Sequence, residues 1–335
     1  MAGEDTAAVA LAHYRRQQRH ARRTANQVQE LWRQIDGGDL TGSWESRVGP
    51  LLVDAVVAGQ LAAASEADAY VEAVIAAEGA QSQAVGRVRP SAFAGRAADG
   101  RALESLLYLP VVTTKTRIAA GQTEVDALLA GLEQMLKIAA SEVADAGRGA
   151  TGASMAGNRT IQGWVRVVQP PACSRCIVMA GKEFGWNRGF QRHPRCDCIH
   201  LPTTLIARGR RGRGFLDPKD YFTSLSAAEQ DRIFTAAGAR AIRDGADITT
   251  VVNARRGMYT TEAYGRTVRA TRESTTRRGA FYRQERARAA AAGQVPLSGR
   301  GFRLMAPRLL PEEIYRLAES RTEAIAMLRR FGYLT

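Results

Sequence analysis

Residues 164–205 read WVRVVQPPACSRCIVMAGKEFGWNRGFQRHPRCDCIHLPTTL. This stretch holds all the cysteines of the chain, Cys173, Cys176, Cys196 and Cys198, and two of its four histidines. A β-branched run stopped by a pair of prolines precedes the cysteines, and a second apolar run follows them. Runs of this kind are typical of short strands. The stretch therefore predicts a small β-containing module built around a cluster of Cys and His side chains.

The four cysteines and His193 have the spacing of a metal site. A gap of two residues between Cys173 and Cys176 lets both thiolates face one ion. On an extended segment Cys196 and Cys198 point the same way. These residues predict a zinc site, with the four cysteines as ligands or with His193 in place of one thiolate. Four protein ligands leave no position for water, so we expect a structural site.

Two other interpretations of the cysteines stay open: a pair of disulfides, which a reducing cytosol disfavours, and inert thiols. Catalytic interpretations find less support. A nucleobase deaminase needs a His-x-Glu sequence ahead of its cysteine pair, and this chain has none. A papain-like dyad would have to use His193 or His200, without a supporting motif.

The region before the module, residues 1–146, is predicted to form a bundle of long helices. It is rich in Ala, Glu, Gln and Leu, and Thr123 opens its clearest helix with Asp126 at the third position of a capping-box-like start. His13 and His20 fall in a polar helix and are expected at the surface. One face of the helix after Thr123 is expected to be buried, with the residues Val125, Leu128, Leu129, Leu132, Leu136 and Val143.

Three further segments complete the predicted organisation. Residues 147–157 (GRGATGASMAG) are predicted to be a linker, residues 158–206 the Cys/His module, and residues 207–335 a basic helical region. Helices are predicted to begin at Ser226, Asp247, Pro311 and Ser320, and the first of them to end at Gly245. The expected fold class is α+β and predominantly α-helical.

The 335 residues carry a net charge of +14, which favours a polyanionic partner over a small neutral substrate. No stretch reaches the ~20 uncharged apolar residues of a membrane span, and the first residues lack the basic-then-apolar order of a signal peptide. We therefore expect neither a membrane partner nor secretion by a standard route.

Most of the excess charge lies in residues 255–308, where thirteen Arg stand against three Glu, with aromatic residues interleaved. Such a stretch can follow a phosphate backbone with little sequence preference. An acidic protein partner and a solvated face are the alternatives. Together with the basic loop at 208–214, the candidate nucleic-acid-binding residues are Arg208, Arg210, Arg211, Arg213, Arg255, Arg256, Arg266, Arg269, Arg272, Arg277, Arg278, Arg283, Arg286 and Arg288.

The pattern CxxC…HPRCDC…P, from Cys173 to Pro202, resembles the head-morphogenesis motif of phage Mu F-like minor capsid proteins. Three later segments and the closing helices are similar to versions from phages and prophages of actinobacteria. These segments are residues 217–222 (DPKDYF), 239–247 (ARAIRDGAD), 252–260 (VNARRGMYT) and 311–334. The resemblance covers the chain from about Trp164 onward, and the helical region before it matches only in character.

This resemblance implies a non-enzymatic minor capsid protein of a tailed phage or prophage. Such a protein would associate with the portal and the major capsid protein, and would contact double-stranded DNA during packaging. It would lie in the virion, in the capsid interior or at the portal vertex, after assembly in the host cytoplasm. The alternative is an enzyme, either a capsid maturation protease or a zinc-dependent nuclease. The resemblance supplies no catalytic residues, and the zinc site is inferred from donor spacing alone.

Overall fold

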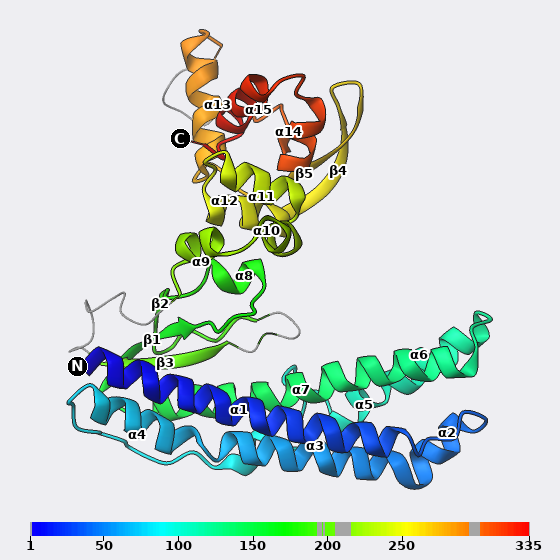
Figure 1. The fold of residues 1–335 in the computed structure, drawn as a ribbon. Coiled ribbons are helices and arrows are strands. Elements are labelled where there is room, and N and C mark those ends of the chain that lie inside the picture. Colours follow the sequence, from blue (N-terminus) through cyan, green and yellow to red (C-terminus); the bar gives the residue numbers. More distant parts are fainter. Residues whose placement is uncertain (1, 193–195, 197, 205–215, 295–301, 335) are drawn as a thin grey trace. The chain divides into compact units, whose positions relative to one another are not determined.

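The chain divides into two compact units (Figure 1). The first comprises Met1–Pro170 with Ala180–Phe215, and the second Pro171–Met179 with Leu216–Thr335. The computed structural model describes all residues except 1, 193–195, 197, 205–215, 295–301 and 335. His193 and the predicted basic loop at 208–214 therefore lie outside the described residues. The fold is mostly helical with small antiparallel sheets, in line with the expected fold class.

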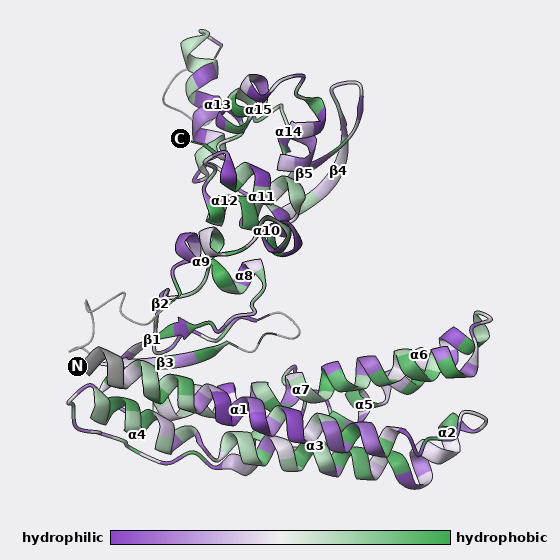
Figure 2. Cartoon of the chain, in the orientation of Figure 1, coloured by the Kyte–Doolittle hydropathy of each residue, from purple (hydrophilic) through white to green (hydrophobic). Residues whose placement is uncertain are grey.

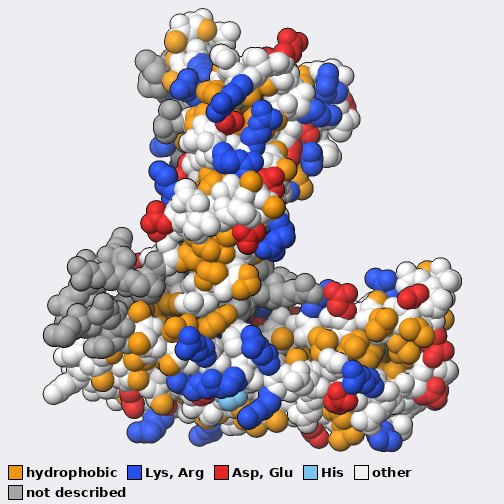
Figure 3. Space-filling model, in the orientation of Figure 1, with side chains coloured by type: hydrophobic (Ala, Val, Ile, Leu, Met, Phe, Trp, Pro, Cys, Tyr) orange, Lys and Arg blue, Asp and Glu red, His pale blue; other side chains and the backbone are white. Residues whose placement is uncertain are grey.

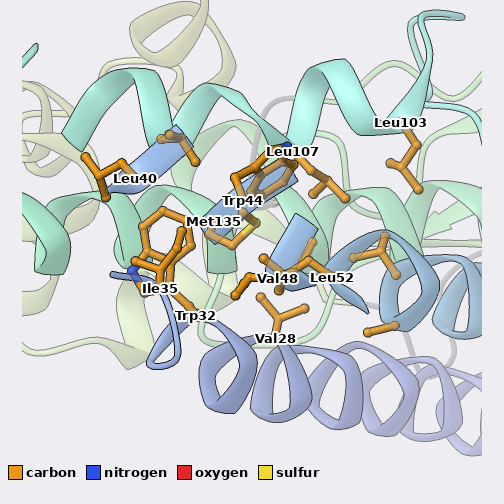
Figure 4. Packing of buried hydrophobic residues seen from close by; sticks show 14 residues of the cluster. Val28, Trp32, Ile35, Leu40, Trp44, Val48, Leu52, Leu103, Leu107 and Met135 are labelled. Carbon is orange, nitrogen blue, oxygen red and sulfur yellow. The ribbon is translucent and has the colours of Figure 1, made fainter. Parts of the chain in front are cut away.

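Helices make up most of the first unit. They are α1 (Ala2–Trp32), α2 (Leu40–Ser43), the π-helix η1 (Trp44–Val48), α3 (Gly49–Ala64), α4 (Ala67–Ala77), the 3-10 helix η2 (Pro90–Phe93), α5 (Leu103–Leu107), α6 (Leu109–Ala119) and α7 (Glu124–Ala156). The three long helices α1, α3 and α7 run side by side (Figure 1). Their main core lies where Trp32, Trp44, Leu52 and Met135 meet, each at most 3% exposed (Figure 4).

The predicted start of α7 is confirmed, because Thr123 is its N-cap and accepts a hydrogen bond from the backbone N–H of Asp126 at 3.2 Å. The predicted buried face is wrong in part. Val125 and Leu129 are 67% and 58% exposed, whereas Val143 is 0% exposed, as expected. Other fully buried positions of this helix form a neighbouring stripe of mostly small side chains. Small residues let α7 approach its neighbouring helices closely. A search for periodic Leu and Val residues does not detect such a contact face. That stripe consists of Ala127, Gly131, Met135 and Ala139.

The linker expected at residues 147–157 is also wrong. α7 continues through it to Ala156, and Gly157 is its C-cap. Gly147 serves packing here, because a Cβ at this position would lie 2.2 Å from Oε1 of Gln17 on α1. The Gly-rich composition predicts a flexible segment. In the structure, one side of the segment is buried, at Gly147, Arg148, Ala150 and Thr151, and three of these four residues are small enough for close helix contact.

A three-stranded antiparallel sheet in the order β2-β1-β3 completes the first unit. β1 (Ile161–Val167) and β3 (Ile199–Thr204) confirm the two predicted strands, and β2 (Glu183–Gly185) is an addition that the sequence did not reveal. Val165 pairs with Leu201 and Val167 with Ile199. These four side chains form a core with Ala10 of α1 and with Tyr70 and Val74 of α4. The sheet is thereby fixed on the helices.

One helical stretch, Leu40–Ala77, is long and apolar enough to cross a membrane by length and composition alone, with a mean hydropathy of 1.5 over its best 18 residues. Nearly half of that window, 44%, is buried inside the unit. Core helices of soluble proteins satisfy the same criteria. Figure 2 shows α3, which lies in this stretch, as more hydrophobic than α1, and its Leu52 and Val56 lie in the main core.

The second unit is assembled from short helices and a second small sheet. Its helices are α8 (Ser174–Ile177), α9 (Pro218–Ser224), α10 (Ala227–Phe234), α11 (Ala236–Arg243), α12 (Ile248–Ala254), the 3-10 helix η3 (Arg255–Gly257), α13 (Ala280–Ala291), α14 (Pro311–Leu317) and α15 (Arg321–Arg330). The predicted helix starts are confirmed: Ser226, Asp247 and Ser320 are N-caps, and Pro311 is the first residue of α14. The helix expected to run from Ser226 to Gly245 breaks at Thr235, which has φ +68°.

The basic region expected to be helical contains helices but also a small sheet. β4 (Met258–Ala263) and β5 (Arg266–Thr271) form an antiparallel hairpin, and β6 (Arg308–Leu309) joins it beside β5. Tyr264 and Gly265 make the turn, both with positive φ, which is the geometry of a tight two-residue hairpin loop. Tyr, Thr and Val residues on both sides of these two residues carry the strand signal, which the many arginines obscure.

Candidate metal centre

Cys173 and Cys176 lie at the start of α8. Cys173 is the N-cap, and its sulfur accepts a hydrogen bond from the backbone N–H of Cys176 at 3.5 Å. The helical turn buries Cys176, which is 3% exposed, and leaves Cys173 exposed. The two-residue spacing therefore produces a tight turn with one sulfur inside and one at the surface.

Cys196 and Cys198 immediately precede β3 and are 5% and 0% exposed. The sulfur atoms of Cys176, Cys196 and Cys198 all lie within 4.8 Å of one another. Tetrahedral zinc with Zn–S bonds of ~2.3 Å places its sulfur ligands about 3.8 Å apart. Three of the five predicted ligands thus lie close enough to hold a metal ion. Cys173 is not part of this group, and His193 lies outside the described residues.

Arg148 of α7 supports the backbone of the cysteine segment. Its Nε donates a hydrogen bond to the carbonyl oxygen of Cys198 at 3.0 Å, and a terminal nitrogen donates to the carbonyl of Cys196. The same guanidinium pairs with Asp145, which also pairs with Arg192. Arg148 is 7% exposed, so these bonds form away from water, where each is strongest. The sequence did not reveal the role of Arg148, because the Gly-rich composition of residues 147–157 predicts a linker.

Arg166 of β1 supplies a second buried guanidinium beside the cysteines. One of its terminal nitrogens lies 4.0 Å from the sulfur of Cys196, and the other donates to the carbonyl of Gln191 at 2.6 Å. Its guanidinium also lies 4.0 Å from the ring centre of Phe190. A cation beside a sulfur favours the thiolate, which is the form that binds metal. The sequence contains one sign that Arg166 has a special role, because it is a charged residue within the apolar run WVRVV.

A buried group of three sulfurs held by fixed backbone suits a structural metal ion. Soft thiolate ligands select zinc among the common divalent ions, and buried sulfurs exclude exchange with solvent.

His13 is buried, although the sequence predicted it at the surface. It is 2% exposed and stacks on Tyr70 with ring centres 3.7 Å apart. Glu66 lies beside it, with a carboxylate oxygen 3.4 Å from Nδ1 of His13 and the other 2.8 Å from Nε2 of the half-buried His20. Tyr70 in turn donates to the carbonyl oxygen of His200 on β3 at 2.8 Å. This network connects α1 and α4 to the strand that follows the cysteines.

Burial and charge perturb two groups of this network. Burial lowers the pKa of His13, and the nearby Glu66 opposes this effect only in part. Burial alone would raise the pKa of Glu66, but the adjacent His13, His20 and Arg16 outweigh it and lower the pKa to about 2. At neutral pH the network therefore contains a neutral His13 beside an ionised Glu66.

The candidate nucleic-acid-binding arginines divide into four groups. Three of them pair with glutamates: Arg255 with Glu312, Arg269 with Glu313 at 3.1 Å, and Arg288 with Glu285 at 3.1 Å. Arg286 is half-buried. Six others are exposed and have no ion pair among the described residues: Arg256, Arg266, Arg272, Arg277, Arg278 and Arg283. The remaining four, Arg208, Arg210, Arg211 and Arg213, lie outside the described residues.

One further arginine of the basic stretch, Arg308, is structural. It is 2% exposed, and its guanidinium donates to the carbonyl oxygens of Phe331, Glu273 and Gly332 at 2.7, 3.1 and 3.3 Å. Part of the positive charge of residues 255–308 thus stabilises the second unit itself, and the exposed arginines are the ones available to a partner.

No protein-family model, no curated protein and no solved structure matches this chain.

Proposed function

We propose that this chain is a non-enzymatic minor capsid protein of a tailed phage or prophage, acting in head morphogenesis. It associates with the portal and major capsid proteins and contacts double-stranded DNA without sequence preference. It resides in the virion, in the capsid interior or at the portal vertex, after assembly in the host cytoplasm. The proposal extends the resemblance of residues 164–334 to phage Mu F-like proteins, with the buried cysteine group as the structural observation that carries it.

The cysteine group supports a structural role. All three clustered sulfurs are buried, and Arg148 and Arg166 hold the surrounding backbone. Zinc held in this way stabilises a fold, since a catalytic zinc needs a position open to substrate. Residues 158–206 would then be a metal-stabilised module that supports the helices packed against it.

The exposed arginines of the second unit support contact with DNA. Arg266, Arg277 and Arg283 are exposed, and no glutamate or aspartate among the described residues pairs with them. Contacts of guanidinium with phosphate release counterions, and the affinity they provide depends on salt and not on sequence.

Exposed apolar side chains on the first unit support contact with a protein partner. Val112 of α6 and Val125 and Leu129 of α7 are 43%, 67% and 58% exposed. Figure 3 shows hydrophobic side chains gathered over this end of the helical bundle. Large exposed apolar patches are rare on soluble monomeric proteins, and they often mark sites of protein interaction. The portal and the major capsid protein are the partners that the proposal assigns to such a surface.

The test is DNA affinity of the full chain over a salt titration, with two charge-matched variants. Changing Arg266, Arg277 and Arg283 to Gln should weaken binding and reduce the slope of log affinity against log salt by about 2.7. Changing Arg15, Arg22 and Arg23 to Gln removes the same charge from exposed positions of α1 and should have little effect. Equal effects of the two variants, or a flat salt response, would contradict the DNA contact.

The neighbouring genes test the capsid assignment itself. Terminase and portal genes directly upstream are expected for a head-morphogenesis protein, and their absence would count against it.

The enzymatic alternative has one observation in its favour. The described group holds three sulfurs, and a catalytic zinc uses three protein ligands and leaves a fourth position to water. A zinc-dependent nuclease would cut plasmid DNA, and a capsid maturation protease would cut purified capsid protein. Cleavage that is lost in Cys198→Ser would replace the proposal with an enzyme.

A further inference from the structure

The first unit contains a cavity of about 650 Å³. The second half of α7 forms one side of it, and residues 186–190 and Arg192, which follow β2, form another. Clefts of ~300–1,000 Å³ are the usual size of small-molecule sites. The cysteine sulfurs do not line this cavity, so it is a separate feature from the candidate metal centre.

Both sides of the cavity are held in place. On α7, Gly149 and Gly152 provide a surface without side chains, and a Cβ added at Gly152 would meet no atom within 4 Å. On the other side, the indole N–H of Trp164 donates to the carbonyl oxygen of Arg188 at 3.1 Å. Trp164 also stacks on Phe190, with ring centres 5.1 Å apart. The cavity is therefore formed before any ligand arrives.

Aromatic and cationic groups line the cavity together. Trp186 lies on its wall and is 49% exposed, which is unusual for the largest apolar side chain. Arg188 is exposed and has no ion-pair partner among the described residues. The two lining carboxylates are already neutralised: Asp99 pairs with Arg101 at 2.8 Å, and Asp145 pairs with Arg148 and Arg192. An anion can thus enter without facing an uncompensated carboxylate.

His200 provides an independent indication of a ligand. It lines the cavity, is 3% exposed, and its Nδ1 is buried without a hydrogen-bond partner in the described structure. Its ring is fixed edge-on against Trp164 and Phe190, with ring centres 4.5 and 4.4 Å away. A buried polar atom without a partner is costly, and a polar group of a ligand would satisfy it.

We propose that this cavity binds a nucleotide, with its base stacked on Trp186, its phosphate held by Arg188, and a polar group of the ligand hydrogen-bonded to Nδ1 of His200. Bases stack on aromatic side chains irrespective of sequence, and guanidinium groups pair with phosphate. The nucleotide is either free or the terminal or unpaired nucleotide of a strand, because both present the same chemistry. The site depends neither on bound zinc nor on the capsid assignment.

The test is calorimetric titration of the full chain with deoxyadenosine monophosphate, deoxyadenosine and inorganic phosphate. The monophosphate should bind at one site per chain, and more tightly than either half of the molecule. A short single-stranded oligonucleotide that competes for the site would identify the strand as the source, and failure to compete would identify the free nucleotide. Absence of saturable binding by both nucleotide and oligonucleotide would overturn the proposal, as would inorganic phosphate binding equally well.

Two variants place the binding in this cavity. Trp186→Ala should weaken nucleotide affinity about tenfold, the amount expected for one lost stacking contact. Gly152→Leu should abolish binding by filling the cavity, while circular dichroism shows that the helix content is kept. Arg188→Gln should also weaken nucleotide affinity, because it removes the cation that holds the phosphate. Arg22→Gln, which removes an exposed arginine of α1, is its charge-matched control and should leave nucleotide affinity unchanged. Unaltered affinity in both Trp186→Ala and Gly152→Leu would rule out this cavity.

Discussion

Arg148 donates a hydrogen bond from Nε to the carbonyl oxygen of Cys198 at 3.0 Å, which fixes the segment before β3 on helix α7. A terminal nitrogen of the same guanidinium donates to the carbonyl of Cys196. The buried side chain of Arg148 thus orients the backbone carbonyls of two candidate ligands, Cys196 and Cys198. Arg148 lies on α7, about fifty residues before these cysteines in the sequence.

Arg148→Met should release this segment. The two carbonyl oxygens lose their buried donors, at a cost of about 1–3 kcal/mol in the free energy of unfolding. The thiols of Cys196 and Cys198 should also label faster with a maleimide in the native protein. Arg192→Met is the matched control, because it removes a partner of Asp145 but leaves both carbonyl bonds. Equal labelling rates in the two variants would show that Arg148 does not position the cysteines.

Two glycines of α7 should respond in opposite ways to the same substitution. At Gly131 a Cβ would lie 2.2 Å from Oγ1 of Thr114 and 2.7 Å from Cζ2 of Trp32, so Gly131→Ala should destabilise the protein by about 1–3 kcal/mol. At Gly152 a Cβ meets open space, so Gly152→Ala should stabilise the helix by about 0.5–1 kcal/mol. Urea denaturation compares the two, and a stable Gly131→Ala variant would contradict the close packing of α6, α7 and α1.

The network of His13 and Glu66 should make the protein acid-sensitive in two steps. His13 has a lowered pKa in the folded state, so the unfolded chain binds its proton first as pH falls below 6.5, and stability declines there. Glu66, with a folded pKa of about 2, contributes stability above 4.5 that is lost as pH falls toward 2. The slope for each group is at most about 1.4 kcal/mol per pH unit.

His13→Phe separates the two steps. The ring should still stack on Tyr70, while the loss of stability between pH 7 and 5 becomes smaller. The loss below pH 4.5 should shrink but persist, because His20 and Arg16 still lower the pKa of Glu66. Arg16, His20, Tyr70 and Glu66 face the same site and are unchanged in this variant. Denaturation curves of both proteins at several pH values give the comparison. An identical slope between pH 7 and 5 would contradict a buried neutral His13.

The sequence predicted those elements whose signals are local. The capping residues Thr123, Ser226, Asp247 and Ser320 each mark a helix start, because a cap is a contact between residues three apart. β1 and β3 follow from their β-branched runs. Local patterns suffice where the stabilising contact is itself local.

Errors arose where distant contacts decide the structure. Residues 147–156 resemble a linker until α1 is known to pack against Gly147. His13 lies in a polar helix, and only Tyr70 and Glu66, more than fifty residues away, make its position a buried one. The cysteine spacing predicted a cluster, of which the structure describes three sulfurs together, whereas the supporting Arg148 had no signal in its own neighbourhood.

The most direct test of the account is the metal content of the full chain, purified without chelator and measured by native mass spectrometry. We expect one zinc ion per chain, lost in Cys176→Ser, Cys196→Ser and Cys198→Ser, and kept in Cys173→Ser, whose sulfur lies outside the buried group. A wild-type chain that carries no metal while its buried thiols react with maleimide as fast as Cys173 would contradict the claim that these three cysteines form a metal centre.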